Sequence, residues 1–143
     1  MPQVRNKLTR VGTGVCRGVD AVPVTVEVRL GGPQGTPKVL GVADNGVREA
    51  LFRILGAFSS QSLPMPRGIP TISLSPASVR KTGSGFDLPM ALALGGAAGM
   101  VSIPPSLAAL GEVSLGGEIL PTPGIIAVAI AARSAGFSMA AIL

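Results

Sequence analysis

Residues 74–92 read LSPASVRKTGSGFDLPMAL, and this stretch decides how the chain is interpreted. The pattern predicts an apolar strand, a basic glycine-rich turn and then an apolar helix that opens at Asp87. A turn of this kind presents backbone N–H groups and positive charge at a helix N-terminus, where an anion or a catalytic oxygen can be held. Ser84 follows Lys81 closely enough to be considered as a nucleophile with its base. The turn is therefore either an active site or part of a scaffold.

The side chains of this turn favour the scaffold. Lys81 is predicted to lie on a solvated loop, where an amine keeps a pKa well above neutrality and is a poor base. Arg80 and Lys81 are then a solvated basic turn, and Ser84 supports the start of the helix. Asp87 is expected to act as a structural helix cap, because the helix dipole favours a carboxylate at this end. Acid–base or metal chemistry by Asp87 is the less favoured alternative.

The composition predicts a single domain, residues 1–143, with a thin polar surface. Hydrophobic residues make up 47% of the chain, charged residues 13%, and the mean hydropathy is +0.55. Such a balance suggests that another domain or subunit covers some apolar surface. The net charge of +5 is compatible with binding to a polyanion. The basic candidates for contact with DNA or a neighbouring subunit are Arg48, Arg53, Arg67, Arg80 and Lys81.

Several functional classes are disfavoured by residues that the chain lacks. It has no histidine, which argues against histidine catalysis and most zinc sites, so no metal site is predicted. The single cysteine, Cys16, fits a reducing cytosol, and a cytoplasmic location is expected. Residues 88–111 carry no charge, but glycines and prolines interrupt them. A buried helix followed by a loop explains this segment better than a membrane span.

Strands and helices are predicted in an order typical of an α+β fold, a mixed sheet with helices packed mainly on one face. The predicted strands cover residues 8–19, 23–30, 38–42, 71–74, 110–115, 118–120 and 138–143. The predicted helices cover residues 45–61, with Asp44 or Asn45 as the cap, then 87 to 95–99, and 124–135. Gly116 and Gly117 predict a tight two-residue hairpin turn between the fifth and sixth strands.

Ordered motifs along nearly the whole chain resemble the Mg-chelatase-like AAA+ proteins of bacteria, the YifB/ComM family. The motifs are GVD (18–20), VTVEV (24–28), GVAD (41–44), VRE (47–49), LSPA (74–77), RK (80–81), GSGFDLP (83–89), AL (91–92), LGEVSL (110–115), GE (117–118), LP (120–121) and Gly124. The resemblance implies an N-terminal domain with the ribosomal protein S5 domain 2-like fold, shared with the proteolytic domain of Lon and the C-terminal domain of RadA. It also implies a parent protein whose AAA+ ATPase module forms rings, and ComM-like members are implicated in DNA branch migration during transformation.

The chain itself lacks the motifs of an ATPase and of a Lon-type peptidase. No Gly-x-x-x-x-Gly-Lys-Ser/Thr occurs, so ATP and Mg²⁺ are expected only in a downstream AAA+ module and no cofactor in this domain. Alignment with the Lon motifs puts Gly85 at the nucleophile position and Ile126 at that of the base lysine. The predicted function is a non-catalytic domain for oligomer assembly and partner or DNA binding, with self-association through the parent ring and no membrane contact. The alternatives are a Lon-like serine peptidase using Ser84 and Lys81, and a stand-alone binding module.

Overall fold

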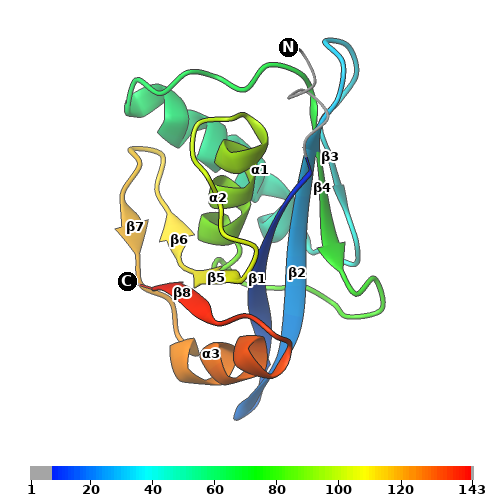
Figure 1. Ribbon diagram of the computed structural model, residues 1–143, viewed down its shortest axis with the longest axis vertical. Helices are drawn as coiled ribbons and strands as arrows, with labels where there is room; N and C mark the ends of the chain where they lie inside the picture. The colour runs from blue at the N-terminus through cyan, green and yellow to red at the C-terminus, as the bar shows by residue number, and fades with distance from the viewer. Residues whose placement is uncertain (1–7, 143) are drawn as a thin grey trace.

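The computed structural model describes residues 8–142, which form a mixed α/β fold with three helices (Figure 1). The elements in chain order are β1 (Leu8–Arg17), β2 (Asp20–Leu30), β3 (Lys38–Leu40), α1 (Asn45–Ser60), β4 (Pro70–Ser75), α2 (Asp87–Ala97), β5 (Leu107–Leu110), β6 (Glu112–Val113), β7 (Ile119–Leu120), α3 (Ile125–Ser134) and β8 (Met139–Ile142). The predicted mixed sheet is confirmed. No helix within the described residues is long and apolar enough to cross a bilayer, and residues 88–111 form most of α2, a loop and β5.

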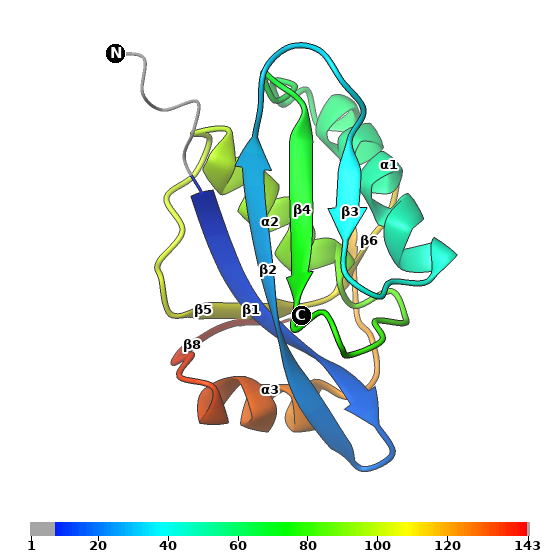
Figure 2. The same ribbon diagram turned by 90° about the vertical axis from the view of Figure 1, so that its right-hand side faces the viewer.

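The main sheet has six strands in the order β3-β4-β2-β1-β5-β8. Its centre is antiparallel: β2 pairs with β1 along the whole hairpin and with β4 on its other side. The outer strands β3, β5 and β8 run parallel to their neighbours (Figure 2). The strand pairing between β1 and β5 is confined to one pair, Gly12 with Ala108. Beyond this pair the two strands separate, and the candidate site lies where they part.

Helices lie mainly on one face of the sheet, as predicted, but α3 lies on the other face of β1. A Cβ atom on Gly96 of α2 would lie 2.6 Å from the Thr9 methyl group, so α2 packs on the Thr9 face. A Cβ atom on Gly14 would lie 3.3 Å from Val128 of α3. Because successive strand residues point to opposite faces, α2 and α3 lie on opposite faces of β1. Figure 2 shows α1 with α2 behind the sheet, so the predicted arrangement holds for two of the three helices.

Local sequence signals account for most element boundaries. Asp44 caps α1, and its side chain accepts a hydrogen bond of 3.0 Å from Val47 N, as predicted. The strand predicted over residues 110–115 is only partly present, because the chain leaves the main sheet at Gly111: Leu110 ends β5, and Glu112–Val113 form the short strand β6. There Gly111 N donates to Gly85 O at 3.1 Å, and its carbonyl accepts from Leu88 N at 2.9 Å. Gly111 thus pairs with the start of α2, and the chain then forms the predicted hairpin, β6 with β7.

Candidate functional site

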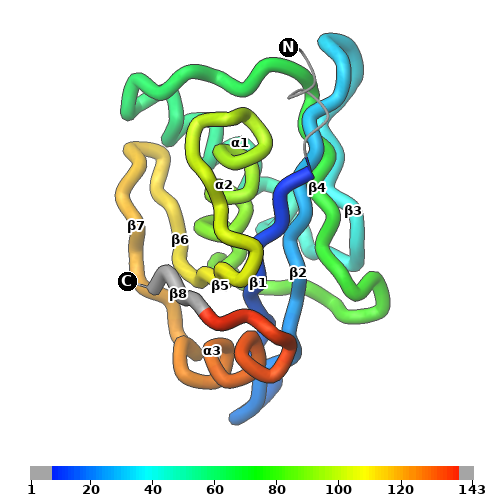
Figure 3. The backbone as a smooth tube through the Cα atoms, in the orientation of Figure 1, coloured from blue at the N-terminus to red at the C-terminus, as the bar shows by residue number. Residues whose placement is uncertain are grey.

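The turn between β4 and α2 is fixed to the start of α1 through the backbone of Lys81. Lys81 N donates to Val42 O at 2.6 Å, and Lys81 O accepts from Asp44 N at 3.1 Å. In the view of Figure 3, the chain then runs behind β2 and β1 to the start of α2. The glycine-rich part of the turn is therefore held at both ends, by α1 and by Gly111.

The Lys81 side chain is fully buried, with 0% of its surface exposed. Its amine donates a hydrogen bond to the Pro76 carbonyl, and no carboxylate within the described residues forms an ion pair with it. Burial lowers the pKa of the Lys81 amine. The prediction of a solvated lysine is therefore wrong, because the amine lies between Pro76 in the turn and Gly41 in the segment after β3. In this position Lys81 cannot contact DNA or a neighbouring subunit.

Ser84 lies on the wall of a cleft of about 410 Å³, between the turn, the end of β1 and the start of α3. The residues that line this cleft, here named the β1 cleft, are Gly14, Val15, Cys16, Gly18, Thr82, Gly83, Ser84, Gly85, Phe86, Leu110, Thr122, Pro123, Gly124 and Val128. Lys81 is not among them, and its amine bonds to Pro76 rather than to Ser84. The two residues that could have formed a catalytic pair are thus not joined in this structure.

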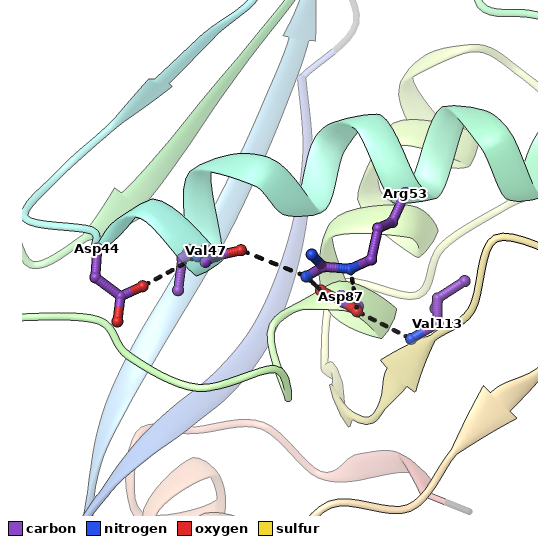
Figure 4. Close-up of polar contacts among 6 residues, drawn as sticks. Asp44, Val47, Arg53, Asp87 and Val113 are labelled. Atoms are coloured by element: carbon purple, nitrogen blue, oxygen red, sulfur yellow. Dashed lines mark hydrogen bonds and ion pairs between the residues drawn. The ribbon is translucent and has the colours of Figure 1, made fainter.

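The Asp87 side chain bonds to other elements of the fold and is not the predicted helix cap (Figure 4). It lies in the first turn of α2, but its buried carboxylate forms no capping hydrogen bond to the helix. Its Oδ1 accepts from Arg53 Nη2 at 2.8 Å, and its Oδ2 accepts from Arg53 Nε at 3.3 Å and from Val113 N at 3.0 Å. The prediction is wrong because partners from α1 and β6 supply the donors that a cap would have found locally.

Residues 24–142 match the family described as subunit ChlI of Mg-chelatase. The chain belongs to this family. It is 32% identical over 131 residues to YifB of Salmonella typhimurium and 33% identical over 133 residues to YifB of Escherichia coli, in each case 90% of this chain and 26% of the relative. It is 29% identical over 118 residues to the competence protein ComM of Haemophilus influenzae, 81% of this chain and 23% of that protein. The chain thus spans about a quarter of the length of these relatives, and the resemblance seen in its motifs is confirmed.

The structure of this ChlI-family chain divides the predicted basic contacts into two groups. Arg48 and Arg53 are engaged internally. Arg48 donates to Ala43 O at 3.1 Å and to Val39 O at 3.0 Å, and the hydrogen bonds to Asp87 raise the pKa of Arg53. Arg67 and Arg80 are exposed and remain available for an external partner.

Two features of this ChlI-family chain could not be predicted from its sequence. The pairing of Arg53 with Asp87 joins residues 34 positions apart, and no local pattern marks it. The β1 cleft is formed by four separate segments, of which only the turn was predicted from the sequence as a candidate site. Within residues 8–142, no three Asp, Glu or Cys side chains gather closely enough to hold a metal ion.

Proposed function

We propose that this chain is a non-catalytic N-terminal domain, with the ribosomal protein S5 domain 2-like fold, of a Mg-chelatase-like AAA+ ATPase. Its role is oligomer assembly and partner binding, and ATP and Mg²⁺ belong to the AAA+ module of the parent protein. The observation that carries the role is an apolar surface formed by α3 and the tip of the β1–β2 hairpin. Its members are Ile126, 77% exposed, Ile130, 63% exposed, and Val19, 92% exposed.

These side chains form one surface, here named the α3 face. Ile126 and Ile130 are four residues apart and so project from the same side of the helix. Val19 and Ile130 also line a common hollow beside α3. Large apolar side chains that gather on a surface mark sites of protein contact. The remaining three quarters of a YifB-like parent, or a neighbouring copy in its ring, is the occupant that we propose.

The turn between β4 and α2 supports the proposal that the domain is non-catalytic. Lys81 is buried and bonded to Pro76, so it is poorly placed to take a proton from Ser84. Neither Gly85 nor Ile126, at the positions that the Lon motifs use, carries a reactive group. If the domain were a peptidase, Ser84→Ala would abolish peptide hydrolysis by the purified protein. We expect no hydrolysis that depends on Ser84.

The test of assembly uses the full-length protein with Ile126→Asp and Ile130→Asp together. Sedimentation velocity over a range of concentrations should show self-association weakened by about tenfold or more, because two charges would be buried in the contact. Val101→Asp is the matched control, since Val101 is also apolar and is 45% exposed but lies away from α3. Unchanged assembly in the double variant would refute the role of the α3 face.

DNA binding is a second candidate, favoured by the net charge of +5 and by the exposed side chains of Arg67 and Arg80. In a ComM-like parent this contact would serve DNA branch migration during transformation. Such a protein would act in the cytoplasm, where Cys16 would stay reduced.

A further inference from the structure

Among residues 8–142, the edge of β1 that faces β5 has no strand partner beyond Gly12. Arg17 and Asp20 flank the two-residue turn of the β1–β2 hairpin and are paired. Residues next to such a turn exchange hydrogen bonds with each other, so Arg17, Val15 and Thr13 direct their backbone groups to β2. The backbone groups of Gly12, Gly14 and Cys16 therefore point away from β2, toward the side of β5. The pairing of Gly12 with Ala108 agrees with this alternation.

The ladder between β1 and β5 stops because Gly111 turns to another partner. In a continuing parallel ladder, Gly111 N would donate to Gly14 O. Instead it donates to Gly85 O at 3.1 Å. Neither the Gly14 carbonyl nor the backbone N–H or carbonyl of Cys16 bonds to any other described loop or side chain. These three backbone groups thus have no partner among the described loops and side chains, and Gly14 and Cys16 both line the β1 cleft.

The chemistry of the cleft wall suits an extended peptide. None of its lining residues is charged, so a charged side chain would lose its hydration there without a partner. Five of the lining residues are glycines, which lets a second backbone approach closely. Leu110, Val128 and Phe86 offer apolar contact. Thr122 Oγ1, also on the wall, is buried and has no hydrogen-bond partner among the described residues.

We propose that the β1 cleft binds an extended, uncharged segment of a partner protein, rich in small apolar residues, as an added strand on the edge of β1. Main-chain hydrogen bonds to Gly14 and Cys16 supply affinity, and the wall selects small side chains. At about 3.3 Å per residue, a segment of four or five residues spans this edge. This inference rests on the proposed partner-binding role and names the class of partner. It involves no cleavage of the bound segment.

The test measures binding of a fluorescein-labelled pentapeptide, Ser-Val-Ala-Val-Ser with blocked ends, by fluorescence anisotropy with the full-length protein. Cys16→Pro removes the backbone donor that faces the cleft, whereas Cys16→Ala keeps it and removes only the thiol. We expect Cys16→Pro to weaken binding about tenfold or more and Cys16→Ala to change it by less than about twofold. Proline is tolerated at a strand edge whose N–H faces outward, which makes the variant suitable.

Two further measurements keep the proposal testable if Cys16→Pro does not fold. A pentapeptide with N-methyl groups on alternate backbone nitrogens cannot form the ladder, and it should not bind. Hydrogen–deuterium exchange at the Cys16 amide should be slowed by the unmodified peptide. Absence of binding, equal binding of the methylated peptide, or unchanged exchange at Cys16 would each overturn the proposal.

The outcomes separate this inference from the proposed assembly role. Ile126→Asp with Ile130→Asp should leave peptide affinity unchanged, because neither residue lines the cleft. If the peptide fails to bind while those substitutions still weaken assembly, only the inference about the cleft is wrong. If the peptide binds while assembly is unaffected, the assembly role of the α3 face is wrong.

Discussion

Arg53 holds both carboxylate oxygens of Asp87, with Nη2 at 2.8 Å from Oδ1 and Nε at 3.3 Å from Oδ2. The Asp87 side chain is 1% exposed and the Arg53 side chain 30% exposed, so the pair lies at the border of the core. Since Asp87 also accepts from Val113 N, one carboxylate connects α1, α2 and β6. The contact therefore joins three elements that the sequence order keeps apart.

Asp87→Asn should lower the free energy of unfolding by about 2–3 kcal/mol, because Arg53 loses its charged partner and the amide cannot accept all three hydrogen bonds. Urea denaturation measures the change. Glu49→Gln, an exposed substitution on α1, the helix of Arg53, should alter stability by less than about 0.5 kcal/mol. Equal stability of Asp87→Asn and the parent protein would contradict the structural role of the pair.

Lys81 should make stability depend on pH. Burial lowers its pKa from the 10.5 of an unfolded chain, so between the native pKa and 10.5 the unfolded chain binds more protons. The contribution of Lys81 to the free energy of unfolding therefore rises with pH through this window. Lys81→Met should remove that rise in urea denaturation series between pH 7 and 10. The exposed Lys38→Met serves as control, and an identical slope in both variants would argue against a buried amine.

Gly12→Ala should destabilise the fold by about 1–3 kcal/mol. The new Cβ atom would lie 2.7 Å from the ring of Phe137, and Gly12 is also the residue that joins β1 to β5. Thermal or urea unfolding gives the measurement. At Gly32, in the loop after β2, no described residue apart from its two chain neighbours has an atom within 4 Å of an added Cβ, so Gly32→Ala should be neutral within about 0.5 kcal/mol. A neutral Gly12→Ala would show that the Phe137 ring moves aside freely.

If the domain binds DNA, Arg67→Ala with Arg80→Ala should weaken binding and make it less sensitive to salt. Each lost phosphate contact lowers the log–log salt slope by about 0.9, so the double variant should lose a little under 2. Anisotropy of a labelled duplex at several salt concentrations measures the slope. Arg133→Ala, on α3, is the matched exposed control. A slope unchanged in the double variant would exclude both arginines from the DNA contact.

The sequence was sufficient wherever a short pattern determines structure. Asp44 predicted the start of α1, and the alternation of β2 predicted a strand. The Gly116–Gly117 pair predicted the hairpin at the right place, but its turn also includes Leu115 and so has three residues rather than two. It failed where the decisive contact is distant. Lys81 looked solvated because its neighbours in the sequence are polar, yet its side chain lies under the turn. Asp87 looked like a cap because its donors, on α1 and β6, could not be seen from its own helix.

The position of Asp87 also has a mechanical consequence. Its neighbour Phe86 lines the β1 cleft, while its carboxylate is bonded to Val113 at the base of the β6–β7 hairpin. A force applied to that hairpin therefore reaches the cleft wall by two routes, through the Asp87 carboxylate and through the backbone bonds of Gly111 to Gly85 and Leu88. Ser60 and Gln61 of α1 also bond to the tip of the hairpin, so pulling it from the domain would break contacts to α1 as well as the bond from Val113.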